Sequence, residues 1–181
     1  MRFDRAIFVA LAVLGSALVF VLLIGGVVRF YSVPSEAMNP TLPRGCHVVV
    51  TRISHAARGD IVTFIHPLRR QTYMSRVVAT ANDVVELRAK QLYVNGEMVR
   101  EPYVVHEDPR TYPHSSWLPE PYRSRDHFGP FRVPSDSFFV LGDNRDDAFD
   151  SRFWGALPRA NLLGRVRLAY SSARGVWAPS R

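Results

Sequence analysis

The sequence predicts a mostly β domain of antiparallel sheets, preceded by one N-terminal helix. Short runs rich in β-branched residues recur after residue 30, and glycine, proline or asparagine separates them. The Asn95-Gly96 pair between two such runs is a strong signal for a tight hairpin. Because no comparably long helical period appears after residue 30, the rest of the chain is expected to be mostly β.

The N-terminal helix is expected over residues 6–29 and is predicted to cross a membrane. Ala6 to Val28 form 23 consecutive residues without a charge. A helix of that length spans roughly 34 Å, enough for a bilayer core with some tilt. A cleavable leader usually has a shorter apolar core, which favours an uncleaved anchor. The short N-terminal segment of residues 1–5 carries a slight positive excess, so we place it on the cytoplasmic side of the membrane and residues 30–181 on the extracytoplasmic side.

Residues 30–181 are interpreted as one domain of short strands with an irregular insertion near 104–130. Five prolines interrupt polar and aromatic residues in this insertion, which is typical of a loop. Strand-like runs occur at residues 46–50, 60–65, 73–78, 84–87, 91–94, 131–134, 138–141 and 164–170.

The charge of the chain does not indicate nucleic-acid binding. The net charge is +7, but acidic and basic residues are mixed throughout, and no run of five Lys or Arg occurs. A basic face beside anionic lipid headgroups is the better explanation. All but one of the 23 basic residues are arginine, and the exception is Lys90. The single Cys46 is interpreted as a small buried apolar residue.

Four segments of the chain stand out as motifs: Val33 to Leu42, Gly59 to Val62, Ser75 to Val78 with Asp83 and Leu92 to Gly96, and Gly142 to Gly155. In this order they resemble the motifs of type I signal peptidases, membrane-anchored serine proteases that remove leader peptides from exported proteins. The last segment is too long to be a plausible accident. The resemblance implies a signal-peptidase-like β domain outside the plasma (inner) membrane, held by a single membrane pass.

The chain departs from this family at the positions that carry the chemistry. The resemblance implies a serine nucleophile, and a neutral lysine that takes its proton, but these two positions hold Ala37 and Ser75. The position of a serine that orients the lysine holds Ala148. Only the serine on the oxyanion side, Ser35, is retained. Neither methyl group can give or accept a proton, and the hydroxyl of Ser75 is barely basic.

Other residues offer little prospect of replacing the missing groups. Lys90 precedes a strand-like run in what looks like a turn, so we expect it to be solvated and protonated. Ser35 would need a histidine as base, and no motif places His47, His55 or His66 beside it. Four charged residues of the last motif are expected to hold a loop through paired carboxylates and guanidinium groups: Asp143, Arg145, Asp150 and Arg152.

The leading hypothesis is a membrane-anchored signal peptidase homologue that binds extended peptides, such as the signal peptides of exported proteins, with little or no protease activity. One alternative is an active signal peptidase that uses other residues. Another is a non-catalytic subunit of a paralogous peptidase. The expected partners are the lipid bilayer, extended peptide segments and, as a further candidate, such a paralogue. No cofactor, metal or nucleic acid is expected, because ligand spacing and phosphate-binding loops are absent from the sequence.

Overall fold

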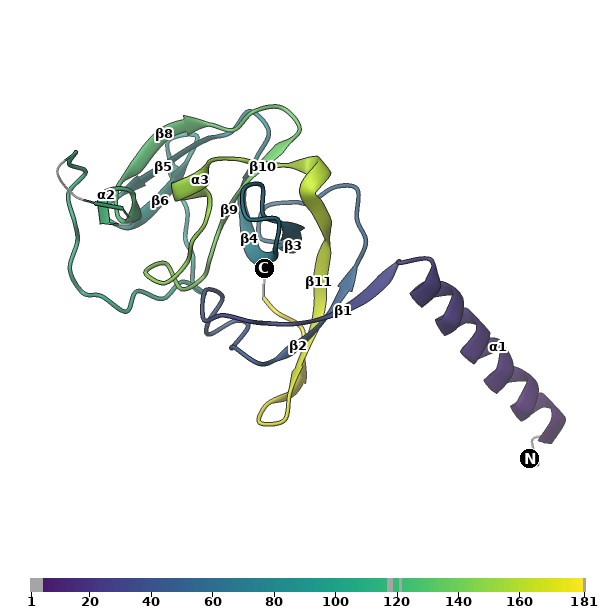
Figure 1. The fold of residues 1–181 in the computed structure, drawn as a ribbon. Helices are drawn as coiled ribbons and strands as arrows, with labels where there is room; N and C mark the ends of the chain where they lie inside the picture. The colour runs from purple at the N-terminus through teal and green to yellow at the C-terminus, as the bar shows by residue number, and fades with distance from the viewer. Residues whose placement is uncertain (1–4, 117–118, 121, 181) are drawn as a thin grey trace.

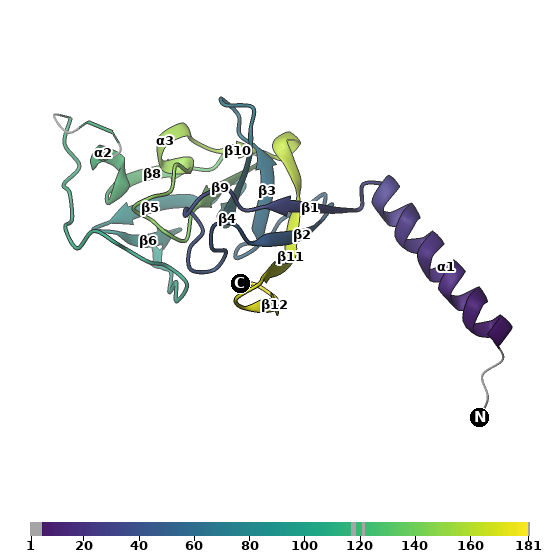
Figure 2. The same ribbon diagram turned by 60° about the horizontal axis from the view of Figure 1, so that its bottom comes forward.

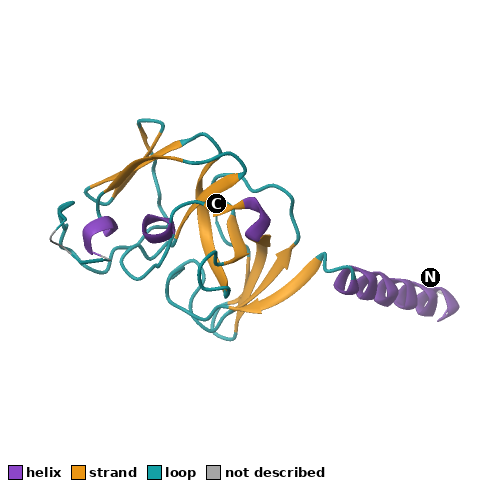
Figure 3. Cartoon of the chain, turned by 45° about the horizontal axis from the view of Figure 1, so that its top comes forward, coloured by secondary structure: helices purple, strands orange, loops and turns teal. Residues whose placement is uncertain are grey.

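A computed structural model describes residues 5–116, 119–120 and 122–180 (Figure 1). Helix α1 (Arg5–Ile24) projects away from a β domain that contains the rest of the described chain, as two views show (Figures 1 and 2). Strands are the main regular structure of that domain, and its other helices are short (Figure 3). The predicted mostly β fold with antiparallel sheets is therefore confirmed.

Helix α1 is shorter than the predicted segment of residues 6–29. It ends at Ile24, and residues 28–32 form the first strand instead. The physical cause is the Gly25-Gly26 pair, because the Gly25 N–H closes the last turn on the Val21 carbonyl at 2.8 Å and Gly26 has a positive φ of 63°. In the part of the chain that the structure describes, no helix is both long and apolar enough to cross a membrane. The predicted transmembrane helix is thus not confirmed. Residues 1–4 of the predicted N-terminal segment lie outside the described residues.

The larger sheet has eight strands, and every pairing in it is antiparallel. Strand β12 (Gly175–Trp177) pairs with the end of β11 beside the main path of the sheet. That path runs β1 (Val28–Ser32), β2 (His47–Thr51), β11 (Leu162–Ser171), β3 (Ile61–Ile65), β4 (Thr72–Thr80), β9 (Ser137–Leu141) and β10 (Leu157–Pro158).

The smaller sheet lies at the end of the domain that is far from α1 (Figures 1 and 2). The predicted hairpin at Asn95-Gly96 is confirmed, since both residues have a positive φ and join two paired strands. The strand order is β7 (Glu97–Met98), β6 (Gln91–Val94), β5 (Val84–Arg88) and β8 (Phe128–Arg132).

The segment near 104–130, expected to be irregular, contains short regular elements. Helix α2 (Tyr122–Arg125) lies within it, and β8 begins at Phe128. Near its start, Val105 forms an isolated parallel bridge with Asn144. The segment therefore packs along the loop of residues 142–150, which directly follows β9.

Among the described residues, three apolar clusters form the interior of the domain, and one of them contains residues of the turn between β1 and β2. It includes Val33, Met38 and Leu42 from the turn after β1, together with Met74 from β4. The turn is thereby attached to the sheet by its buried side chains. The prediction for Cys46 is also confirmed, because its side chain is 1% exposed in this cluster and burial raises the pKa of its thiol.

Candidate functional site

The turn between β1 and β2 holds two small residues, Ser35 and Ala37, between buried side chains. Met38 and Leu42 are 2% and 0% exposed, and the Leu42 N–H donates to the Met38 carbonyl at 2.8 Å. Between the buried Val33 and Met38, Ser35 is exposed and Ala37 is half-buried. The buried residue at each end fixes the place of both.

A cleft of about 250 Å³ lies beside this turn. Residues 33–38 form one wall, residues 71–75 at the start of β4 form the second, and residues 147–149 form the third. The structure therefore brings together all four residues singled out in the sequence. These residues are Ser35, Ala37, Ser75 and Ala148.

The loop after β9 connects two of these positions directly. The Asn144 N–H donates to the Ala37 carbonyl, and the Ala148 N–H donates to the Asn144 carbonyl, both at 3.1 Å. Gly142 lies against both alanines, and a Cβ added there would stand 2.5 Å from the Ala37 oxygen and would clash with the Ala148 methyl. The absence of a side chain at Gly142 is what lets the turn and the loop approach each other.

The hydroxyl of Ser75 is committed to the backbone. Ser75 lies on β4 opposite Val62 of β3 and is 5% exposed. Its Oγ donates to the carbonyl of the preceding residue, Met74, at 2.8 Å. The cleft thus contains a methyl group at Ala37, another at Ala148 and a hydroxyl at Ser75 whose proton already has an acceptor.

Behind the cleft, a buried ion pair joins its walls. Both Arg76 and Asp143 are 0% exposed, and the guanidinium binds the carboxylate through Nε at 2.8 Å and Nη2 at 2.6 Å. The Thr41 hydroxyl donates to the same carboxylate at 2.6 Å. Arg76 follows Ser75, and Thr41 belongs to the turn that carries Ala37, so Asp143 fastens the first two walls together.

The chain matches a protein-family model described as "Signal peptidase, peptidase S26" over residues 5–171. It belongs to this family. Signal peptidase I of Leptolyngbya laminosa is 35% identical over 147 residues, which are 74% of this chain and 64% of that protein. Signal peptidase I V of Bacillus subtilis is 33% identical over 140 residues, 75% of this chain and 82% of that protein. A crystal structure of a signal peptidase I from Enterococcus faecalis has 27% identity and a TM-score of 0.47, covering 61% of this chain and 96% of that one.

The charged residues of the last motif in this signal peptidase homologue pair partly as predicted. Asp150 and Arg152 do form a bidentate pair, at 2.8 and 2.9 Å, and Asp150 also accepts the Gly142 N–H at 3.0 Å. Asp143, however, pairs with Arg76, and Arg145 pairs with Glu101 at 2.6 Å. The charged residues therefore hold the loop through ion pairs, as predicted. The partners of Asp143 and Arg145, however, come from distant segments of the chain.

The prediction that Lys90 is a solvated lysine is wrong. Its side chain is 11% exposed, and its Nζ donates to the Asp108 carbonyl at 2.6 Å and lies 3.4 Å from Asp146 Oδ1. The reason is the insertion near 104–130, which folds over Lys90 and supplies the carbonyl. Lys90 is not among the residues that line the cleft.

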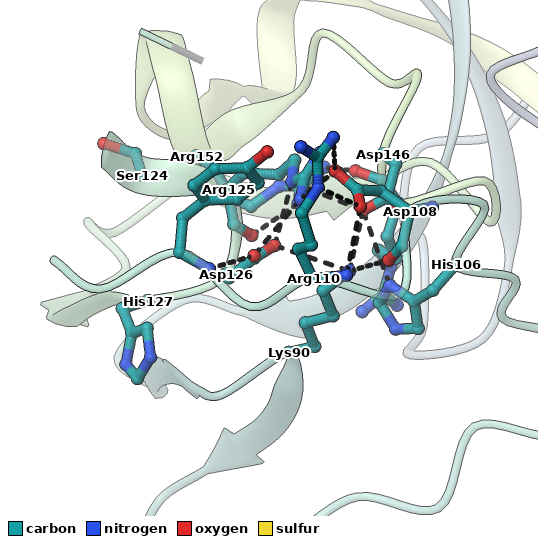
Figure 4. Close-up of polar contacts among 12 residues, drawn as sticks. Lys90, His106, Asp108, Arg110, Ser124, Arg125, Asp126, His127, Asp146 and Arg152 are labelled. Carbon is teal, nitrogen blue, oxygen red and sulfur yellow. Dashed lines mark hydrogen bonds and ion pairs between the residues drawn. The ribbon is translucent and has the colours of Figure 1, made fainter. Parts of the chain in front are cut away.

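Around Lys90, several charged residues connect the insertion to the third wall of the cleft (Figure 4). Asp146 accepts the Asp108 N–H at 2.8 Å and lies 3.4 Å from the Arg125 guanidinium. Burial acts to raise the pKa of Asp146, but the Asp108 N–H, Arg125 and Lys90 outweigh it and hold this pKa below its usual range. Since Asp146 directly precedes the residues of the third wall, the cluster fixes that wall from outside.

None of the three histidines considered as bases lines the described cleft. His47 and His55 are exposed elsewhere on the sheet and its loops. His66 is fully buried behind the Tyr73 ring, and its Nδ1 accepts the N–H groups of Leu68 and Arg69 at 3.1 Å. That nitrogen is therefore unprotonated and Nε2 carries the proton, while burial and Arg69 lower the pKa of the ring. In this state His66 has no free lone pair for a serine proton.

Proposed function

We propose that this signal peptidase homologue binds extended peptides, such as the signal peptides of exported proteins, and cleaves them little or not at all. The observation that supports this most strongly is the cleft itself. The position of the family nucleophile is a methyl group, Ala37, and the position of the family base is Ser75. A cleft with room for a small side chain lies at these positions, and neither residue there can move a proton as a lysine would.

The expected loss of cleavage follows from the chemistry of serine attack. A serine becomes a nucleophile when a nearby base removes its proton, and in this family that base is a neutral lysine. Ala37 has no lone pair with which to attack. Ser75 is too weak a base, and its own proton is donated to Met74. Ala148 can make no hydrogen bond that would orient an amine.

The binding half of the proposal is supported by an open strand edge. Strand β4 pairs with β3 from Thr72 to Arg76, but its pairing with β9 begins only at Arg76. Among the described residues, no strand covers residues 72–75 on the β9 side, and these residues line the cleft. An extended peptide can add there as a further strand, with main-chain hydrogen bonds giving affinity and the cleft accepting small side chains.

Titration of the purified full chain with a synthetic signal peptide tests the binding. Ala37→Leu, which fills the cleft, is expected to weaken binding at least about tenfold, because 1.4 kcal/mol of lost contact corresponds to that factor. Leu68→Ala is the matched control, since Leu68 is 74% exposed and does not line the cleft. Equal affinity of wild type and Ala37→Leu would show that the peptide binds elsewhere.

A second candidate function is an active signal peptidase that uses Ser35. One observation favours it: the Ser35 hydroxyl is exposed in the same cleft as Ala37. In that case purified wild type would cut a leader-bearing substrate at one site, and Ser35→Ala would abolish the cut. Activity that survives Ser35→Ala would exclude this candidate.

We further propose that α1 attaches the domain to the plasma membrane, with residues 30–181 on the extracytoplasmic side. Supporting this, α1 leaves Phe8, Leu14 and Phe20 exposed by 71%, 66% and 63%. Leu14→Glu with Phe20→Glu is expected to remove most binding to phospholipid vesicles in co-sedimentation, whereas Ser16→Ala is not. Unchanged sedimentation would contradict the attachment. Co-purification from native membranes would reveal a paralogous peptidase, the further partner considered.

A further inference from the structure

The C-terminal segment of residues 175–180 reaches both sides of the cleft from behind. Strand β12 folds back onto β11, and residues 178–180 follow it. Here they face Gly59, Asp60 and Arg165 across a shallow pocket. This segment, which we call the tail, is not part of the motifs recognised in the sequence.

The first contact of the tail is with the turn that carries Ala37. The Trp177 indole donates through Nε1 to the Thr41 carbonyl at 3.2 Å. Its ring also packs against the apolar cluster that contains Met38 and Leu42, the two buried anchors of the turn. Trp177 thus holds the turn both by a hydrogen bond and by packing.

The second contact is with the strand that carries Ser75. The Ser180 carbonyl accepts a hydrogen bond from Arg76 Nη1 at 2.7 Å, and the Gly59 carbonyl accepts from the same nitrogen at 2.9 Å. Arg76 is 0% exposed, so a donor that lost this partner would be left incompletely satisfied in the interior. The tail is therefore one of the groups that hold the guanidinium in place.

The two contacts close a ring through the buried carboxylate of Asp143. Asp143 accepts from Thr41 on one side and from Arg76 on the other. Going around the ring, the chain of contacts is Thr41, Asp143, Arg76, Ser180 and, through the tail backbone, Trp177 back to Thr41. A closed ring resists changes in spacing better than the single link through Asp143.

We propose that the tail sets the separation of the turn and of β4, so that Trp177 and the Ser180 carbonyl are positioning groups of the cleft. Its importance for peptide binding rests on the proposed function, but its effect on the turn does not. Val176 beside Trp177 is 66% exposed, whereas Trp177 packs against the cluster of the turn, so the tail holds the domain through Trp177 and the Ser180 carbonyl.

Hydrogen exchange of single backbone amides in the full chain tests the proposal. Trp177→Phe keeps the packed ring but removes the N–H donor, and Val176→Ala is the matched control. The amides of Leu42 and Asn144, which hold the turn and contact Ala37, are expected to exchange at least about fivefold faster in Trp177→Phe and unchanged in Val176→Ala. The Val99 amide, bonded to Leu92 in the smaller sheet, should keep its rate.

Unchanged Leu42 and Asn144 amides in Trp177→Phe would overturn the proposal. An equal acceleration at Val99 would also overturn it, because it would reveal a general loss of stability. Titration with the signal peptide separates this inference from the proposed function. Weaker binding to Trp177→Phe, by about threefold or more, is expected if both hold. If wild type binds no peptide, the proposed function fails, and the exchange rates alone decide the function of the tail.

Discussion

The triple variant Ala37→Ser, Ser75→Lys, Ala148→Ser is expected to cleave a leader-bearing substrate at least about 100-fold faster than wild type. A positioned general base alone contributes that factor or more. The three residues line one cleft, so the new hydroxyl, amine and orienting serine would lie together. Cleavage is measured by mass spectrometry of the products. The double variant without Ala148→Ser is expected to show part of the gain.

Burial at residue 75 makes the lysine suitable as a base. Ser75 is 5% exposed, so an amine introduced there would lose solvation of its ammonium form, which lowers its pKa toward neutrality. The control is Ala37→Ser with Ser75→Arg and Ala148→Ser, because an arginine of similar reach stays protonated. A folded triple variant with no more activity than this control would show that the cleft no longer holds substrate in a reactive position.

Asp143→Ala is expected to destabilise the protein by about 3–5 kcal/mol, the cost of leaving a buried charge without its partner. Arg76 and Asp143 are both fully buried, and the Thr41 hydroxyl would also lose its acceptor. Chemical denaturation measures the free energy of unfolding. Arg76→Met with Asp143→Leu should recover much of the loss, since an apolar pair leaves no unpaired charge.

An exposed ion pair provides the comparison for this prediction. Arg88 and Glu86 lie 2.6 Å apart, but the Arg88 side chain is 57% exposed. Glu86→Ala is therefore expected to change the stability little, because solvent screens such pairs. A loss from Asp143→Ala no larger than that from Glu86→Ala would contradict the view that Asp143 holds the two walls together.

The sequence predicted the strands well, because strand formation depends on local signals. β-branched runs between turn residues located most strands, and Asn95-Gly96 located the hairpin. The positions of Ala37 and Ser75 came from motifs that resemble those of the family. Both residues line one cleft of the described structure.

The partners of charged residues could not be predicted in the same way. Proximity in sequence suggested that Asp143 and Arg145 form ion pairs within their own loop. Instead, Asp143 binds Arg76 on β4, and Arg145 binds Glu101. Lys90 was misjudged because the segment that covers it has no regular pattern. Hydropathy likewise predicted an N-terminal helix that extends past the Gly25-Gly26 pair. Backbone geometry at this pair ends the helix.

The most direct test of the proposed function is incubation of purified wild-type protein with a leader-bearing precursor at concentrations where the two bind. We expect the precursor to remain intact by mass spectrometry, while the triple variant converts it under the same conditions. A single product cut after a small residue, formed by wild type and lost in Ser35→Ala, would contradict the proposal.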